Sequence, residues 1–181
     1  MKRAGLFLAV FCVAALAYAR DFKESWVEKM ADYIGKGIYD VRLDFIPIDN
    51  GYANVLKEKA GGLLGIGGRN VVQIIYANSG KKVECALWYM DSWLGSDETR
   101  ELADIEKLLT SKYGTSVKSG GDLVWTWKKS GGILGMGAQI YQISICRDSS
   151  DGSACVLIQR QNSGFQNRWQ LLLRGLGIKK G

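Results

Sequence analysis

The sequence predicts an α+β fold in which a helix followed by four antiparallel strands occurs twice in tandem, with the helices covering one face of the sheet. The first observation is a Gly-rich segment, residues 59–68 (KAGGLLGIGG), that recurs at 129–138 (KSGGILGMGA) with six of ten positions identical. The second is that the same offset of 70 places Cys85 on Cys155, which indicates a duplication. The third is that helical and alternating apolar spacing occur in the same order in both halves.

The first half begins with a helix that Gly35 and Gly37 end. Its apolar residues at helical spacing are Phe22, Trp26, Met30, Tyr33 and Ile34. Residues 39–45 then alternate apolar and charged side chains, which predicts a half-buried strand. A turn at residues 49–51 follows. The remaining strands of this half are expected over residues 52–59, 70–77 and 83–90.

The second half begins with a helix that Ser96 caps and Gly114 ends. Its strands are expected over residues 115–118, 123–129, 139–146 and 155–160. A C-terminal helix over 163–177 carries an apolar stripe of Phe165, Trp169, Leu172, Leu173 and Leu176. The expected repeats, 20–93 and 94–162, are each about 70 residues long, which is marginal for independent stability. We therefore expect one domain, residues 20–181, with a single shared core.

Residues 1–19 have the three parts of a secretory signal peptide. Lys2 and Arg3 precede an apolar run over residues 6–16, and a small-x-small cleavage site ends at Ala19. The alternative is an uncleaved anchor, but the run is shorter than the ~20 residues of a spanning helix. The sequence therefore predicts a secreted protein, periplasmic or extracellular, from a bacterium.

Cleavage removes Cys12 and leaves an odd number of cysteines in an oxidising compartment. If Cys146 lies opposite Cys155 in a hairpin, the repeat places Tyr76 opposite Cys85 in the first half. We therefore predict a Cys146–Cys155 disulfide, with Cys85 either a free thiol or bonded to a second chain.

The chain has no histidine, which excludes Ser-His-Asp and Cys-His catalysis and histidine metal sites. Carboxylates such as Glu84 and Glu101 show no distinctive spacing, so a carboxylate-based hydrolase is only a second alternative.

Residues 148–152 (DSSDG) lack the full ligand set of a calcium loop and are interpreted as a hairpin turn. The sequence predicts no cofactor and no metal. Export and the lack of a known motif argue against nucleic acid.

The two Gly-rich segments supply the candidate contact residues Leu63, Leu64, Ile66, Ile133, Leu134 and Met136. Two interpretations remain open, because apolar residues in a loop either form an exposed contact tip or fold back into the core.

Trp125 and Trp127 share one face of a strand. We expect that face to point into the core, the alternative being a stacking surface for sugars or bases.

The protein is basic, with a net charge of +6, and loss of the signal peptide leaves 22 basic against 18 acidic side chains, or +4. No acidic residue follows Asp151. The candidate basic surface on the C-terminal segment is Arg168, Arg174, Lys179 and Lys180. It suits an anionic surface such as phospholipid, the alternative being a docked helix with a solvated basic face.

Residues 108–114 (LLTSKYG) followed by Trp125 and Trp127 resemble a helix–strand pattern of small exported bacterial domains, including envelope-assembly lipoproteins. The expected function is a non-catalytic binding or scaffolding protein of the cell envelope, whose partner is an envelope protein or an anionic surface. The alternative is a lipid-surface protein that inserts both Gly-rich loops together with the last helix.

Overall fold

The computed structural model describes residues 22–60, 69–90, 97–130, 138–161, 163, 165 and 168–179. The expected signal peptide lies outside this part of the chain and stays a prediction. The helices are α2 (Glu24–Tyr33), α3 (Ile38–Val41), α4 (Asp97–Tyr113) and α5 (Trp169–Gly175). The strands are β1 (Ile46–Ile48), β2 (Gly51–Ala60), β3 (Arg69–Asn78), β4 (Val83–Met90), β5 (Val117–Ser119), β6 (Asp122–Lys129), β7 (Gln139–Arg147) and β8 (Ala154–Arg160).

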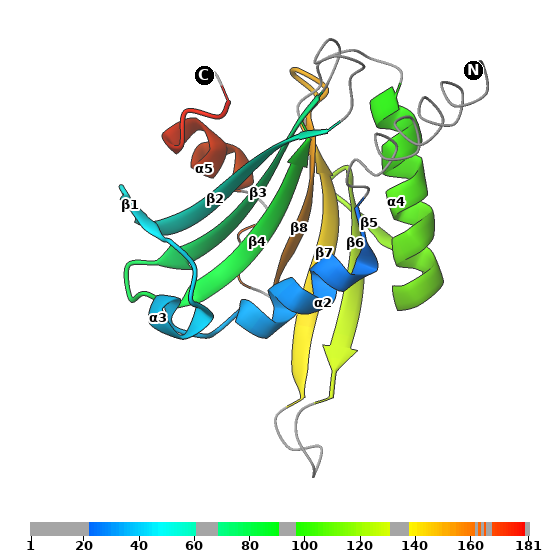
Figure 1. Ribbon diagram of the computed structural model, residues 1–181. Coiled ribbons are helices and arrows are strands. Elements are labelled where there is room, and N and C mark those ends of the chain that lie inside the picture. The colour runs from blue at the N-terminus through cyan, green and yellow to red at the C-terminus, as the bar shows by residue number, and fades with distance from the viewer. Residues whose placement is uncertain are drawn as a thin grey trace, which may run out of the picture.

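The strands form one antiparallel sheet in the order β1-β2-β3-β4-β8-β7-β6-β5, so the chain is an α+β protein as expected (Figure 1). The second four strands mirror the first four about the β4–β8 pair. At the centre of that pair Leu87 lies opposite Leu157, two residues that are 70 positions apart in the chain. The described helices contain none that is long and apolar enough to cross a membrane.

One face of the sheet packs against α2 and α4. Trp26 from α2 and Leu109 from α4 are buried in the same cluster as Ile143 and Ile158 from the sheet. Trp125 is 1% exposed in this cluster, and Trp127 packs against it. The inward orientation predicted for these two tryptophans is therefore confirmed.

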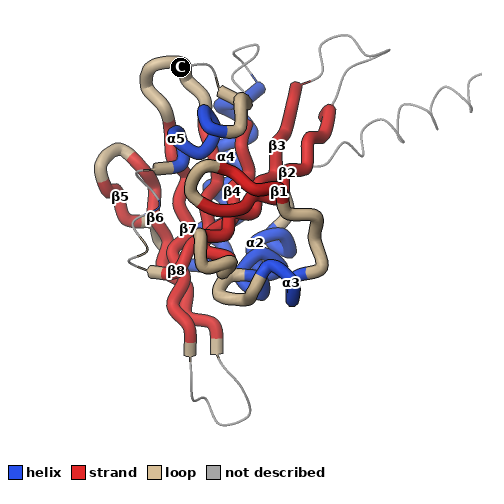
Figure 2. The backbone as a smooth tube through the Cα atoms, turned by 90° about the vertical axis from the view of Figure 1, so that its left-hand side faces the viewer, coloured by secondary structure: helices blue, strands red, loops and turns tan. Residues whose placement is uncertain are grey.

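The prediction that all helices cover one face is wrong, because α5 lies on the other face (Figure 2). Trp169 and Leu173 of α5 are buried in a second cluster with Ile74 and Leu157 of the sheet. The physical reason lies in the central strands. In β4 and β8 almost every residue is buried, so both faces of these strands need a cover.

The strand expected over residues 39–45 is also wrong, because the chain forms the short helix α3 there. The buried residues are Ile38 and Val41, which are three positions apart, and Tyr39 is 75% exposed. The Gly37 N–H donates to the Asp40 carboxylate at 3.2 Å, which caps the first turn. The edge strand β1 follows and pairs with β2 through a turn at residues 49–50.

Helix α5 is shorter than the expected 163–177, although Phe165 is buried as predicted. Before the helix begins, the backbone N–H of Phe165 donates to Oε1 of Gln159 at 3.0 Å, and the Ser163 hydroxyl bonds to the same oxygen. These bonds fasten the segment to the end of β8. The chain then crosses the second face of the sheet to α5.

Candidate functional site

The apolar candidates of the Gly-rich segments, Leu63, Leu64, Ile66, Ile133, Leu134 and Met136, lie outside the described residues. Their flanking strands are described. Ala60 lies opposite Arg69 in one hairpin, and Lys129 lies opposite Gln139 in the other. Because the strands alternate in direction, these two pairs lie at opposite ends of the sheet (Figure 1). The alternative in which both segments enter one lipid surface together stays a prediction, because the segments themselves lie outside the described residues.

The candidate basic surface is corrected in part. Lys179 is 8% exposed and forms ion pairs with Asp148 and Asp151, so it is not a surface cation. Lys180 lies outside the described residues. Arg168 and Arg174 are exposed on α5 and immediately before it. Only these two remain as surface cations on the described part of the segment.

The cysteine register is confirmed, with Cys146 opposite Cys155 and Tyr76 opposite Cys85. All three cysteines are buried free thiols in the structure, so the disulfide stays a prediction. A hydrogen bond with Cys155, followed by burial, raises the pKa of the Cys146 thiol. Burial raises the pKa of Cys85, which is fully enclosed. That enclosure favours the free-thiol alternative over a bond to a second chain.

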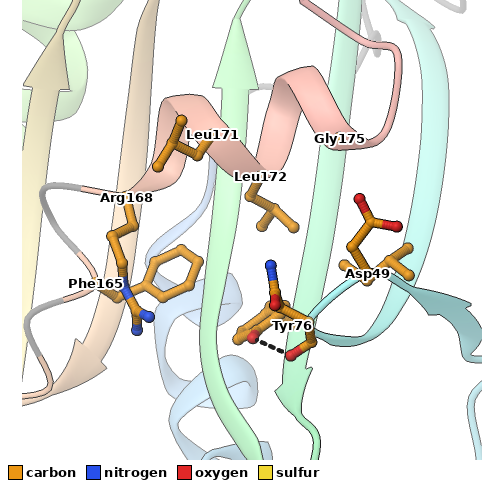
Figure 3. Close-up of a pocket in the computed structure, with 9 residues that line it drawn as sticks. Asp49, Tyr76, Phe165, Arg168, Leu171, Leu172 and Gly175 are labelled. Carbon is orange, nitrogen blue, oxygen red and sulfur yellow. Dashed lines mark hydrogen bonds between the residues drawn. The ribbon is translucent and has the colours of Figure 1, made fainter.

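A cavity of about 150 Å³ lies between α5 and the β1–β2 turn, on the second face of the sheet (Figure 3). The turn and the neighbouring strands contribute Ile48, Asp49, Asn50 and Tyr76. The C-terminal segment contributes Phe165, Arg168, Leu171, Leu172 and Gly175. We name this cavity, with these nine residues, the α5 groove.

The floor of the α5 groove is aromatic. The ring centroids of Tyr76 and Phe165 are 5.0 Å apart, at an interplanar angle of 34°. The Tyr76 hydroxyl donates a hydrogen bond of 2.8 Å to the backbone carbonyl of Asn50, which ties the β1–β2 turn to β3. Burial, with a smaller effect of Glu84, raises the pKa of Tyr76, so this hydroxyl stays protonated at neutral pH.

The rim of the α5 groove carries two opposite charges, with Arg168 on one side and Asp49 on the other (Figure 3). The Arg168 guanidinium lies 5.1 Å from the centroid of the Phe165 ring. Its Nη2 is 3.9 Å from Oε2 of Glu84, whose other oxygen accepts a 2.9 Å bond from Asn78. The arginine is therefore held beside the aromatic floor but remains half exposed.

The second cluster of polar groups joins the C-terminus to the β7–β8 turn. Asp148 Oδ1 accepts from the N–H and hydroxyl of Ser150 at 2.9 and 2.6 Å. Asp151 Oδ1 accepts from Ser153 in the same way. The ammonium group of Lys179 lies between the remaining oxygens of the two aspartates. Lys179 therefore bridges the two aspartates of this turn.

Sequence reasoning identified Arg168 but missed the rest of the α5 groove. It interpreted Asp49 and Asn50 as turn residues only, and Tyr76 as the partner of Cys85. No local spacing reveals the cavity, because α5 forms one wall and the turn between β1 and β2 forms the other. The apolar character of both faces of β4 and β8 is the sequence feature that could have placed α5 there.

No protein-family model, no curated protein and no solved structure matches the chain.

Proposed function

We propose that the protein is an exported, non-catalytic binding protein of the bacterial cell envelope. In this proposal the α5 groove binds a small ligand with an apolar body and one acidic group. The observation that carries the proposal is an open cavity with an aromatic and aliphatic lining and an arginine at its rim. Sites for small ligands commonly combine an apolar lining with a few polar groups that fix the orientation.

The lining favours an apolar ligand body. Leu172 from α5 and Phe165 before it meet the Tyr76 ring across the cavity. Leu171 is 62% exposed at the mouth, where a ligand would cover it. A ligand that removes this apolar surface from water gains about 25 cal/mol for each Å² buried.

The rim favours an acidic group on the ligand. In the described part of the chain, Arg168 has one ion-pair contact, a long one of 3.9 Å to Glu84, and the arginine side chain is 52% exposed. An exposed pair of this kind contributes little to stability. The guanidinium group of Arg168 presents five N–H donors in a planar fork that suits a carboxylate. Asp49 on the opposite rim repels a second acidic group and so orients the ligand toward Arg168.

The polar groups of the groove support binding rather than proton transfer. The Tyr76 hydroxyl is engaged with the Asn50 carbonyl and has a raised pKa. The guanidinium group of Arg168 donates hydrogen bonds and accepts none. A general acid or base needs a pKa near the working pH, and the Tyr76 hydroxyl does not provide one.

We also propose that the two halves arose by tandem duplication. Support comes from the mirrored strand order and from the pairing of Leu87 with Leu157 at the offset of the sequence repeat. The β3–β4 and β7–β8 hairpins share one register under this offset, whereas β6–β7 is shifted by one residue relative to β2–β3.

Calorimetric titration with octanoate, octanol and octylamine tests the ligand chemistry, because these probes share an alkyl chain and differ in charge. Octanoate should bind most tightly, and Arg168→Gln should weaken its binding about tenfold. Octanol binding should stay unchanged in this variant. The matched control is Arg174→Gln, which removes the same charge from an exposed position on α5 outside the groove. Equal loss in both variants, or no preference for octanoate, contradicts the proposal.

A further inference from the structure

A second cavity, of about 310 Å³, lies on the opposite face of the sheet from the α5 groove and shares no residue with it. It lies where the C-terminal end of α2 meets the ends of β6, β7 and β8. We name it the basic pocket and define it by Asp32, Gly35, Lys36, Lys129, Tyr141 and Arg160, which are among its lining residues. Its size is within the range of sites for small ligands.

The charge of the basic pocket is unbalanced. Among the described residues that line it, Lys36, Lys129 and Arg160 carry positive charge and Asp32 is the acidic one. Lys129 is paired with Asp32. Lys36 and Arg160 are exposed, and the described part of the chain gives neither an ion pair. The pocket therefore has an excess of two positive charges.

The guanidinium group of Arg160 lies close to the backbone at Gly35. Gly35 has a φ of +92°, and a Cβ at this position would lie 2.1 Å from Nη2 of Arg160. The guanidinium group therefore packs directly against the chain at the end of α2, where a helix terminus favours a cation. Glycine is favoured there because L side chains rarely adopt this backbone conformation.

The walls of the pocket add hydrogen-bonding groups. The Tyr141 hydroxyl lies 3.0 Å from the backbone carbonyl of Ala31 and 2.5 Å from Oε1 of Gln139. Burial raises the pKa of Tyr141, so the hydroxyl adds no negative charge at neutral pH. The Tyr141 wall of the pocket is therefore neutral.

We propose that the basic pocket binds a phosphate monoester. A phosphate monoester carries about −1.5 to −2 charges near neutral pH, which matches the excess of two positive charges. The planar fork of Arg160 can bind two phosphate oxygens at once, while Lys36 supplies a second cation. The phosphate belongs either to a soluble metabolite or to a lipid headgroup, and the pocket recognises the group they share.

Titration with sn-glycerol 3-phosphate in a zwitterionic buffer of low ionic strength tests this site. Arg160→Gln and Lys36→Gln should each weaken binding about tenfold. The matched control is Lys118→Gln, which removes one exposed charge from β5, outside the pocket, and should change the affinity less than about twofold. Unchanged affinity in both pocket variants, or an equal loss in all three, overturns the proposal. Lys36 is exposed, so its variant keeps the test valid if Arg160→Gln unfolds.

Vesicles distinguish the two sources of the phosphate. If a lipid headgroup is the source, wild-type protein co-sediments with phosphatidic acid but not with phosphatidylcholine, and Arg160→Gln abolishes this binding. If the source is soluble, glycerol phosphate binds and the vesicles do not. Both results support the pocket, whereas vesicle binding that survives in Arg160→Gln and Lys36→Gln contradicts it. Octanoate binding should be unchanged in these variants, so failure here is separate from failure of the α5 groove.

Discussion

The ammonium nitrogen of Lys179 lies 2.9 Å from Oδ2 of Asp151, and this contact joins the end of the chain to the β7–β8 turn. The same nitrogen is paired with Asp148 and lies 3.0 Å from Oγ of Ser153. It also lies 5.3 Å from the ring centroid of Trp169 in α5. The cluster therefore fastens the helix that forms one wall of the α5 groove.

Replacing Lys179 with methionine should lower the free energy of unfolding by about 3 kcal/mol. The variant leaves the nearly buried carboxylate of Asp148 without its cation, and this cost exceeds the gain from the apolar side chain. Urea unfolding followed by tryptophan fluorescence measures the change. Arg174→Met removes an exposed cation from the same segment and should change the stability by less than about 0.5 kcal/mol. Equal effects of the two substitutions would show that the buried cluster contributes nothing specific.

The same cluster predicts a loss of stability in acid. Bonds from Lys179 and then from Ser150 hold the pKa of Asp148 far below its ordinary value. In the unfolded chain this carboxyl regains a pKa near 4, so the unfolded chain takes up a proton that the folded protein does not bind. The stabilisation is present above about pH 5 and is lost as the pH falls. Unfolding free energies between pH 6 and 3 should therefore fall less steeply in Asp148→Asn than in wild type.

A control for this pH dependence is Asp104→Asn on the exposed side of α4, which should leave the wild-type slope unchanged. If Asp148→Asn shows the wild-type slope as well, other carboxyl groups cause the acid sensitivity.

Oxidised protein should contain a Cys146–Cys155 disulfide and a reduced Cys85. The bonds from Asp148 N–H to Ser153 and from Gln161 N–H to Ile140 make Cys146 and Cys155 a hydrogen-bonded cross-strand pair. Cα atoms in such pairs are about 5.5 Å apart, which is within the range that disulfides require. Peptide mapping by mass spectrometry without reduction identifies the bridge. A bridge that contains Cys85 would refute the assignment.

Two glycines should respond in opposite ways to alanine. Gly175 ends α5 without a positive φ, and a Cβ there meets no atom within 4 Å, so Gly175→Ala should stabilise the protein by about 0.5 kcal/mol. Gly35→Ala should destabilise it by about 1–2 kcal/mol because of its positive φ. Thermal unfolding of both variants under the same conditions measures the contrast. Similar shifts in Tm would contradict the backbone assigned to these positions.

Export predicts a specific mature N-terminus. When the full chain is expressed in a bacterium, the secreted or periplasmic protein should begin at Arg20. N-terminal sequencing of the purified protein decides this, and a chain that retains Met1 would remove the support for an envelope function.

The sequence predicted most of the fold because, for most elements, the spacing of the apolar residues and the positions of the turn residues indicate the same boundaries. Strand β4 was predicted with the bounds that the structure has, and the Tyr76–Cys85 pairing followed from the repeat. The prediction failed at residues 39–45, because apolar spacing over a short segment fits both a strand and one helical turn. The burial of Ile38 and Val41, three positions apart, shows that the segment forms a helical turn.

The site was harder to predict than the fold because it depends on contacts between distant segments. The α5 groove needs the β1–β2 turn, Tyr76 in β3 and a helix about 90 residues later in the chain. The basic character of the last segment was visible, but the burial of Lys179 was not. The carboxylate partners of Lys179, Asp148 and Asp151, are about 30 residues earlier in the chain. They lie in a turn whose composition resembles that of any polar turn.

Amide chemical-shift mapping with octanoate tests the central proposal most directly. The shifts should be concentrated at Tyr76, Phe165 and Leu172 and should disappear in Gly175→Leu, whose side chain fills the mouth of the α5 groove. Arg174→Leu, on the same helix but outside the groove, should retain them. Shifts that lie elsewhere on the protein, or that persist unchanged in Gly175→Leu, would contradict the assignment of the α5 groove as the ligand site.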